Sequence, residues 1–343
     1  MGKYLPAGRR NKMKQYLLPP EGRFFKANLH CHSTLSDGKL TPEELKTAYK
    51  GMGYQVLAIT DHDIMVPHDE LNDDHFLTLH GMELEVNEEK DIPWPEKRSC
   101  HFCFIALDEK NLRQPCWHPG RYLFGHSAEH RDKIQIDEET APYIRHYSAE
   151  GISDMMRIGR EKGFFVTYNH PTWSLEDYAC YSGYQHMHAM EICNWGCVME
   201  GYQEYNPRVY DDLLRQGKRI YCIGADDNHG EGDMGGAWVM IKAEKLNYRN
   251  ITDALAQGHF YASQGPEIRE LYVEDGVIYA ACSPAREIVF TCGNRKAKRI
   301  RANEGEVLTE GSFALEEGSR YVRVTVIDQQ GRPADSNAFF FEA

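Results

Sequence analysis

Apolar and polar positions follow a consistent pattern from residue 24 to about residue 262. Short apolar runs alternate there with segments of helical periodicity, which is typical of strands crossed by helices. Strands are expected at residues 24–29 and 55–59. The second run is apolar throughout, so we expect it to be buried on both faces. The pattern predicts an α/β domain over residues 24–262.

A helix is clearly signalled between these two strands. Thr41 is expected as its N-cap, Pro42 takes the first helical position and Glu44 completes a capping box. Apolar residues then recur at helical spacing as far as Met52, and Gly53 follows. The sequence therefore predicts a helix that begins at Pro42 and ends at the glycines.

Two regions depart from the alternating pattern. Residues 86–150 contain several prolines and scattered charge around one expected strand at residues 101–106, which predicts a long insertion and a possible lid. After residue 262, short apolar runs are separated by Gly, Asp and Asn turns without a helical pattern. We expect residues 263–343 to form a small β-sandwich-like domain.

The composition and charge of the chain bear on its partners, its location and the state of its cysteines. The 343 residues carry 39 basic and 52 acidic side chains, a formal charge of −13, which argues against capture of duplex nucleic acid. Residues 1–23 form a polar, basic arm without the apolar stretch of a signal peptide or membrane helix, so we expect a cytoplasmic protein without a membrane partner. The ten cysteines show no regular framework and are expected to be reduced thiols, mostly in the core. The sequence does not predict the oligomeric state.

Histidines and carboxylates repeatedly stand where a buried run gives way to a loop. His30 and His32 are two residues apart on a strand, so both side chains project from one face and can bind one ion. Later strand ends add further candidates, namely Asp37, Asp61, His62, Glu83, His101, His170, Asp226, Asp227 and His229. Active sites of barrels and open α/β sheets are built at the carboxyl ends of the strands, so we expect these side chains to lie together.

A mixture of imidazoles and carboxylates suits Zn, Mn or Fe better than Mg or Ca alone. The candidates are too many for one ion, so we expect two or three divalent ions, with Glu83 able to bridge two of them. Such ions can share a hydroxide and clamp the attacking and leaving oxygens without a nucleophilic side chain. Glu191, on an apolar run, is expected to be a satisfied buried carboxylate near the site. Histidines 118, 126 and 130 lack strand support and are expected at the surface.

The order of these motifs resembles that of the PHP (polymerase and histidinol phosphatase) superfamily, over roughly residues 24–230. The matching motifs are His30-x-His32, Ser36-Asp37-Gly38, Ile59-Thr60-Asp61-His62, Gly81-x-Glu83, His101, Asn169-His170-Pro171 and the aspartate-histidine group near position 226. The resemblance implies a distorted, TIM-like (β/α)7 barrel with a trinuclear metal site. The segment from 235 to 266 resembles a PHP subgroup that ends in a small β domain.

The resemblance also implies a ligand set for each ion. One ion would take His30, His32, Glu83 and an aspartate at 226 or 227. A second would share Glu83 and add His101 and His170, and a third would take Asp37, His62 and His229. The position at the end of the strand favours Asp226 as the ligand, and the Asp-x-His spacing favours Asp227. Both aspartates are therefore kept as candidate ligands.

The predicted function is a metal-dependent phosphoesterase that acts on a small phosphorylated metabolite or nucleotide through a metal-bridging hydroxide. Glu83 would act as the bridging residue, and Asp61 or a metal-bound water would protonate the leaving oxygen. Some members of the resembling subgroup hydrolyse carbamate or amide-like esters, so the same site acting on those bonds is one alternative. The other is a non-catalytic, metal-stabilised binding module.

Overall fold

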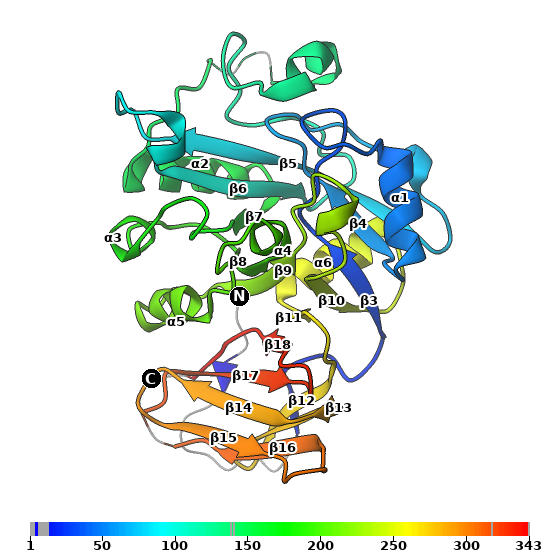
Figure 1. Cartoon of the computed structure of the whole chain (residues 1–343), viewed down its shortest axis with the longest axis vertical. Coiled ribbons are helices and arrows are strands. Elements are labelled where there is room, and N and C mark those ends of the chain that lie inside the picture. Colours follow the sequence, from blue (N-terminus) through cyan, green and yellow to red (C-terminus); the bar gives the residue numbers. More distant parts are fainter. Residues whose placement is uncertain (1–3, 6–13, 138, 140, 317, 342–343) are drawn as a thin grey trace.

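The computed structural model describes residues 4–5, 14–137, 139, 141–316 and 318–341, and Figure 1 shows a mixed α/β part joined to a β-rich part. Seven strands of the larger part lie in the order in which they occur along the chain. They are β3 (Arg23–Asn28), β4 (Val56–Ile59), β5 (Leu77–Asn87), β6 (Ser99–Ala106), β7 (Phe164–Tyr168), β8 (Ala189–Asn194) and β9 (Tyr221–Ala225). β10 (Trp238–Ala243) follows and lies antiparallel beside β3.

The strand directions differ from a regular β/α repeat at one place. β3, β4 and β5 run parallel, as do β7, β8 and β9, but β6 is antiparallel to both of its neighbours. A single parallel bridge between Cys31 and Asn228 joins the segments that follow β3 and β9. The mixed α/β fold is therefore confirmed, while a (β/α)7 barrel stays a prediction because no continuous ladder joins β3 and β9 in the described chain.

The helices of this part connect the strands. They are α1 (Pro42–Gly51), α2 (Ala149–Glu161), α3 (Tyr178–Tyr181), α4 (Trp195–Met199), α5 (Pro207–Arg215) and α6 (Tyr248–Gln257). The predicted start of α1 is confirmed, since Thr41 and Glu44 exchange both bonds of a capping box and Pro42 is the first residue. None of the described helices combines the length and the apolar character needed to cross a membrane.

The β-rich part consists of two packed sheets. Its strands are β11 (Phe260–Ser263), β12 (Ile268–Glu274), β13 (Val277–Ala285), β14 (Glu287–Cys292), β15 (Ala297–Arg301), β16 (Leu308–Ala314), β17 (Tyr321–Ile327), β18 (Pro333–Ser336) and β19 (Phe339–Phe341). Leu271, Ile278, Phe290 and Val324 belong to the core between the sheets. β11 pairs with both β10 and β18, so the large sheet runs on from one part of the molecule into the other.

The described residues of the N-terminal arm belong to the β-rich part. β1 (Tyr4–Leu5) pairs with β19, and β2 (Gln15–Tyr16) pairs with β12. Most of the rest of the arm predicted at 1–23, residues 1–3 and 6–13, lies outside the described chain. All ten cysteines are unpaired, and nine of them are buried.

Candidate metal centre

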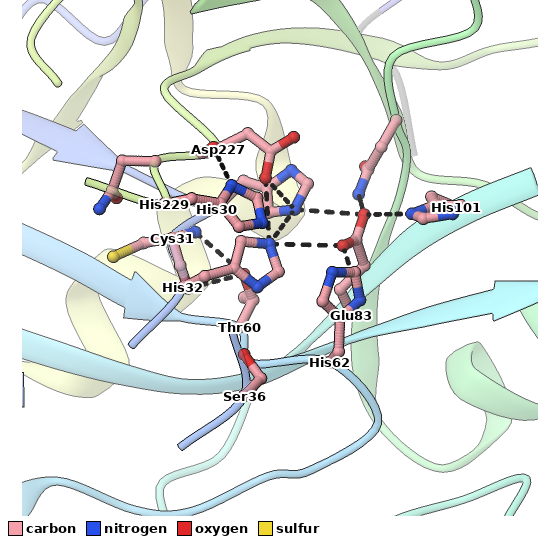
Figure 2. Close-up of polar contacts among 12 residues, drawn as sticks. His30, Cys31, His32, Ser36, Thr60, His62, Glu83, His101, Asp227 and His229 are labelled. Carbon is pink, nitrogen blue, oxygen red and sulfur yellow. Dashed lines mark hydrogen bonds and ion pairs between the residues drawn. The ribbon is translucent and has the colours of Figure 1, made fainter. Parts of the chain in front are cut away.

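Most of the predicted ligands come together in one cluster, and Figure 2 labels His30, His32, His62, Glu83, His101, Asp227 and His229. His30 and His32 follow β3, His62 follows β4, and Asp227 and His229 follow β9. Glu83 and His101 lie within β5 and β6, and His170 follows β7. Because the parallel strands present their carboxyl ends at one edge, residues up to 199 positions apart meet there.

The first group consists of His30, His32, Glu83 and Asp227, all buried. Asp227 Oδ1 lies 3.1 Å from His30 Nε2 and 3.0 Å from His32 Nε2. The carboxylate of Glu83 is 3.2 Å from His30 Nε2 and 3.4 Å from His32 Nε2. Two imidazoles and two carboxylates thus face a common point, as in a four-ligand metal site.

A second group forms around the same glutamate. Glu83 Oε2 is 3.3 Å from His62 Nδ1, and Glu83 Oε1 is 3.4 Å from His101 Nδ1 and 3.2 Å from His170 Nε2. The two carboxylate oxygens therefore face different sets of histidines. This position suits a carboxylate that bridges two ions.

The third group lies on the more open side and contains His32, Asp37, His62 and His229. Asp37 Oδ2 is 3.4 Å from His229 Nε2 and 3.7 Å from His62 Nε2, and Asp37 Oδ1 is 3.7 Å from His32 Nδ1. In each group the possible ligand atoms lie within 4.8 Å of one another. His32 and His62 each belong to two groups, so neighbouring ions would lie close together.

The chemistry of these residues fits divalent metal ions. Several buried atoms of the cluster have no hydrogen-bond partner, namely His32 Nδ1, His62 Nδ1, His101 Nδ1, His101 Nε2 and Asp227 Oδ1. Buried polar atoms are normally satisfied, and an unsatisfied one costs about 1–3 kcal/mol. Imidazole nitrogens and carboxylate oxygens are ligands for Zn, Mn and Fe, so these residues could hold two or three such ions.

The electrostatics of the cluster favour added positive charge. Burial alone would lower the pKa of His30, but the carboxylates of Asp227, Glu83 and Glu191 outweigh it and raise that pKa well above its usual value. Burial would raise the pKa of Glu83, but His30 and His101 hold it well below the usual value. Burial and the nearby His32 lower the pKa of His62 to about 3, so its imidazole is in the neutral form that binds metals.

A second layer of polar side chains orients the ligands. Glu191 Oε1 lies 2.7 Å from His30 Nδ1, and Glu191 Oε2 accepts from the backbone N–H of His170 at 3.0 Å. Asn169 donates to Glu83 Oε1 at 2.9 Å, and Asn194 donates to Asp227 Oδ2 at 3.0 Å. Such partners fix the tautomer and direction of metal ligands. Glu191 also forms a fourth candidate ligand group with His30 and His170, so its expected role as a satisfied carboxylate outside the ligand set stays a prediction. The sequence did not point to these roles for Asn169 and Asn194.

Asp227, and not Asp226, reaches the cluster. Both oxygens of Asp226 accept backbone N–H bonds from residues 235–237 at 2.7–3.1 Å, and Tyr49 donates to Oδ2 at 3.1 Å. Asp226 therefore fastens the loop after β9 and does not serve as a ligand. The backbone of Asp227 has a φ of 49°, a left-handed conformation that few residues other than glycine adopt.

The role of Asp61 as a proton donor stays a prediction, and in the described structure its carboxylate is engaged by a neighbouring loop. Its carboxylate accepts from the backbone N–H and the hydroxyl of Ser33, both at 2.7 Å, and from the hydroxyl of Ser36 at 2.6 Å. These three bonds hold the loop that carries Asp37 beside the cluster. Asp61 belongs to no ligand group and does not line the cavity above the site.

The insertion supports the loop that carries His62. Ser127 donates to the carbonyl of His62 at 2.7 Å, and Gln114 donates to the carbonyl of Asp63 at 2.7 Å. The buried Arg145 forms an ion pair with Asp63 and donates to the carbonyl of Glu85 at 2.9 Å. The sequence pattern did not predict this role of Arg145. The insertion histidines 118, 126 and 130 belong to none of the ligand groups.

A cavity of about 400 Å³ opens above the ligands. Its floor contains Asp37, His62, Glu83, His101 and His170, together with Asp227 and His229. A small molecule in this cavity would therefore contact the ligand atoms of all three groups. The described structure thus brings several groups of candidate metal ligands together at the strand ends of an α/β protein, beside a cavity.

No family model matches the chain. A curated 5'-3' exoribonuclease of Haemophilus influenzae is 38% identical over 84 residues, which are 24% of this chain and 30% of that relative. The chain thus spans less than a third of the relative's length.

Solved structures offer longer but weaker matches. A two-domain protein from Bacteroides vulgatus that contains a predicted PHP-like metal-dependent phosphoesterase covers 94% of this chain and 95% of its own, at 15% identity and a TM-score of 0.45. A lesion-specific endonuclease from Pyrococcus furiosus covers 68% of this chain and 56% of its own, at 13% identity and a TM-score of 0.39. Both similarities are at low sequence identity. The predicted exclusion of duplex nucleic acid stays a prediction.

Proposed function

We propose that this protein is a PHP-type, metal-dependent phosphoesterase that acts on a small phosphorylated metabolite or nucleotide. One observation carries the proposal. Four overlapping groups of buried or half-buried histidines and carboxylates, three of which contain Glu83 or His30, each contribute at least one residue to the lining of one cavity. Several of their atoms lack any other partner. The curated relative, a 5'-3' exoribonuclease, adds a segment of sequence similarity to a protein that acts on phosphoesters.

The mechanism follows from what each side chain can do. Bound divalent ions would lower the pKa of a water molecule and neutralise charge on the reacting phosphoryl group. Glu83 and Asp227 would hold two neighbouring positions together, and Asp37 with His229 would hold the outermost one. Glu191, Asn169 and Asn194 keep the ligands in place, so little reorganisation is needed during the reaction. The walls of the cavity would position the rest of the substrate.

One observation favours a second substrate class. No lysine or arginine is among the described residues that line the cavity, although such side chains commonly bind phosphate. A carbamate, amide or carboxylic ester is uncharged and does not need them. Hydrolysis of such a bond at the same metal centre is therefore the alternative.

A substrate panel separates the two functions. We expect phosphate release from phosphomonoesters or nucleotides with at least one of Mn, Zn and Fe, and little turnover of aryl carbamates. Glu83→Gln should lower turnover by about 10³-fold or more, since it removes a charge shared by two ligand groups. Glu89→Gln, which changes an exposed carboxylate outside the cavity, is the matched control. If the protein hydrolyses carbamates or amides but releases no phosphate with any of the three metals, the alternative function is the correct one.

A further inference from the structure

The outer wall of the cavity is aromatic and acidic, a feature that hydrolysis alone does not require. Trp94, Trp173 and Phe124 line it together with Glu85 and Glu200. Trp94 is 59% exposed and Phe124 is 50% exposed. Large exposed apolar side chains around a cavity mark a surface that binds another molecule.

The two tryptophans extend outward from the metal ligands. The ring of Trp173 lies 5.1 Å from that of His170 and 5.3 Å from that of His101. Trp94 lies 6.2 Å from Trp173, edge to face, on the segment between β5 and β6. At the inner end of this wall, His101 Nε2 lies 3.5 Å from Glu85 Oε2. A planar group attached to the reacting centre would therefore contact Trp173 first and Trp94 next.

The charges beside these rings are negative. Glu200 accepts a bond from Trp173 Nε1 at 3.0 Å, and Glu85 accepts one from Asn87 at 3.1 Å. Each carboxylate therefore keeps acceptor capacity for a further donor. No described lining residue is a lysine or an arginine, so nothing in the described wall would balance a second anionic group of the substrate.

We infer that the site selects an ester whose leaving group is aromatic and positively charged. The tryptophan faces would bind the ring and attract its charge, and Glu85 and Glu200 would stabilise the cation. A leaving group with its own phosphate or carboxylate would be repelled by the same carboxylates. This inference rests on the proposed function, which defines the ester bond that is hydrolysed. It concerns only the leaving group attached to that bond.

The test uses phosphomonoesters of similar size that differ in charge. We expect kcat/KM for 4-(aminomethyl)phenyl phosphate to exceed that for 4-(carboxymethyl)phenyl phosphate by about tenfold or more. Glu200→Gln should reduce this ratio several-fold while keeping an acceptor for Trp173, and Trp94→Ala should lower kcat/KM for both aryl esters. Glu89→Gln should leave the ratio unchanged. Equal rates, or a preference for the carboxymethyl ester, would overturn the inference and leave the phosphoesterase intact.

A second measurement does not depend on hydrolysis. Benzylammonium should bind the zinc-loaded protein and quench its tryptophan fluorescence saturably, with a lower Kd than benzyl alcohol, and Trp94→Ala should weaken this difference. If no phosphoester is hydrolysed with any metal, the proposed function fails, and this titration decides the inference alone. Equal binding of benzylammonium and benzyl alcohol would then overturn the inferred preference for a positively charged leaving group.

Discussion

Two neighbouring aspartates show what decides a residue's role at this site. Asp226 lies within reach of three backbone N–H groups and a tyrosine hydroxyl, whereas Asp227 turns toward His30 and His32. The sequence predicted that one of the pair is a ligand but not which, because the choice depends on a left-handed φ at Asp227 that no spacing reveals. The hydrogen bonds of Asp61 were not predicted either, since its partners, Ser33 and Ser36, lie on another loop.

The two aspartates predict opposite phenotypes. Asp227→Asn should lower the metal content of the folded protein by about one ion, because it removes a ligand charge from a four-residue group. Asp226→Asn should keep the metal content but cost about 1–3 kcal/mol of unfolding free energy, since a carboxamide cannot accept all of the present bonds. Elemental analysis and denaturant unfolding of both variants measure this difference. The reverse pattern would contradict the assignment.

At the scale of elements, the sequence predicted the ends of the strands better than their parallel or antiparallel direction. The buried runs before His62, His170 and the aspartate pair are β4, β7 and β9, and their shared edge was inferred from parallel strands. The antiparallel direction of β6 was not predicted, because an apolar run has the same appearance in either direction. The capping box of α1 was predicted in full, since it depends only on residues 41–44.

A histidine between two of these strands gives a pH-dependent prediction. His188 Nδ1 accepts from the backbone N–H of Val166 at 3.0 Å, and burial, with a smaller effect of Arg160, lowers its pKa to about 3. The folded pKa lies below the unfolded value of about 6.5, so the stabilisation is complete above pH 6.5 and is lost as the pH falls toward 3. His188→Asn keeps an acceptor without titrating.

Between pH 7 and pH 5, wild type should therefore lose about 1–2 kcal/mol of unfolding free energy relative to His188→Asn. Urea unfolding of both proteins at a series of pH values measures the difference, and the histidines of the metal centre cancel from it. Parallel pH profiles for the two proteins would show that His188 is not held neutral by the fold.

At the scale of the molecule, the β-rich part is joined to the α/β part by a buried ion network. Arg323 of β17 donates to both oxygens of Asp211 in α5 at 2.9 Å and to Asp335 of β18 at 3.1 Å. The sequence predicted the change of character after residue 262, but not this network, because Asp211 lies 112 positions from Arg323 in the chain. We propose that the two parts, divided near that residue, unfold as one unit.

Removal of the central cation tests this coupling. Arg323→Met leaves two buried carboxylates without their partner and should cost about 3–5 kcal/mol of unfolding free energy. Arg299→Met is the control, because this arginine is half exposed on the edge strand β15 and its ion pair with Glu287 should contribute at most about 1 kcal/mol. Thermal unfolding of the two variants measures both effects. Equal losses would contradict a buried network that joins the parts.

The stoichiometry of bound metal tests the multinuclear site most directly. The protein is stripped with a chelator, reconstituted separately with Zn, Mn and Fe, freed of excess ions, and analysed for metal per chain. The ligand groups predict two or three ions per chain with at least one of these metals, and about one ion fewer in Glu83→Gln, while Glu89→Gln matches wild type. Less than one ion per folded chain with every metal would contradict the account.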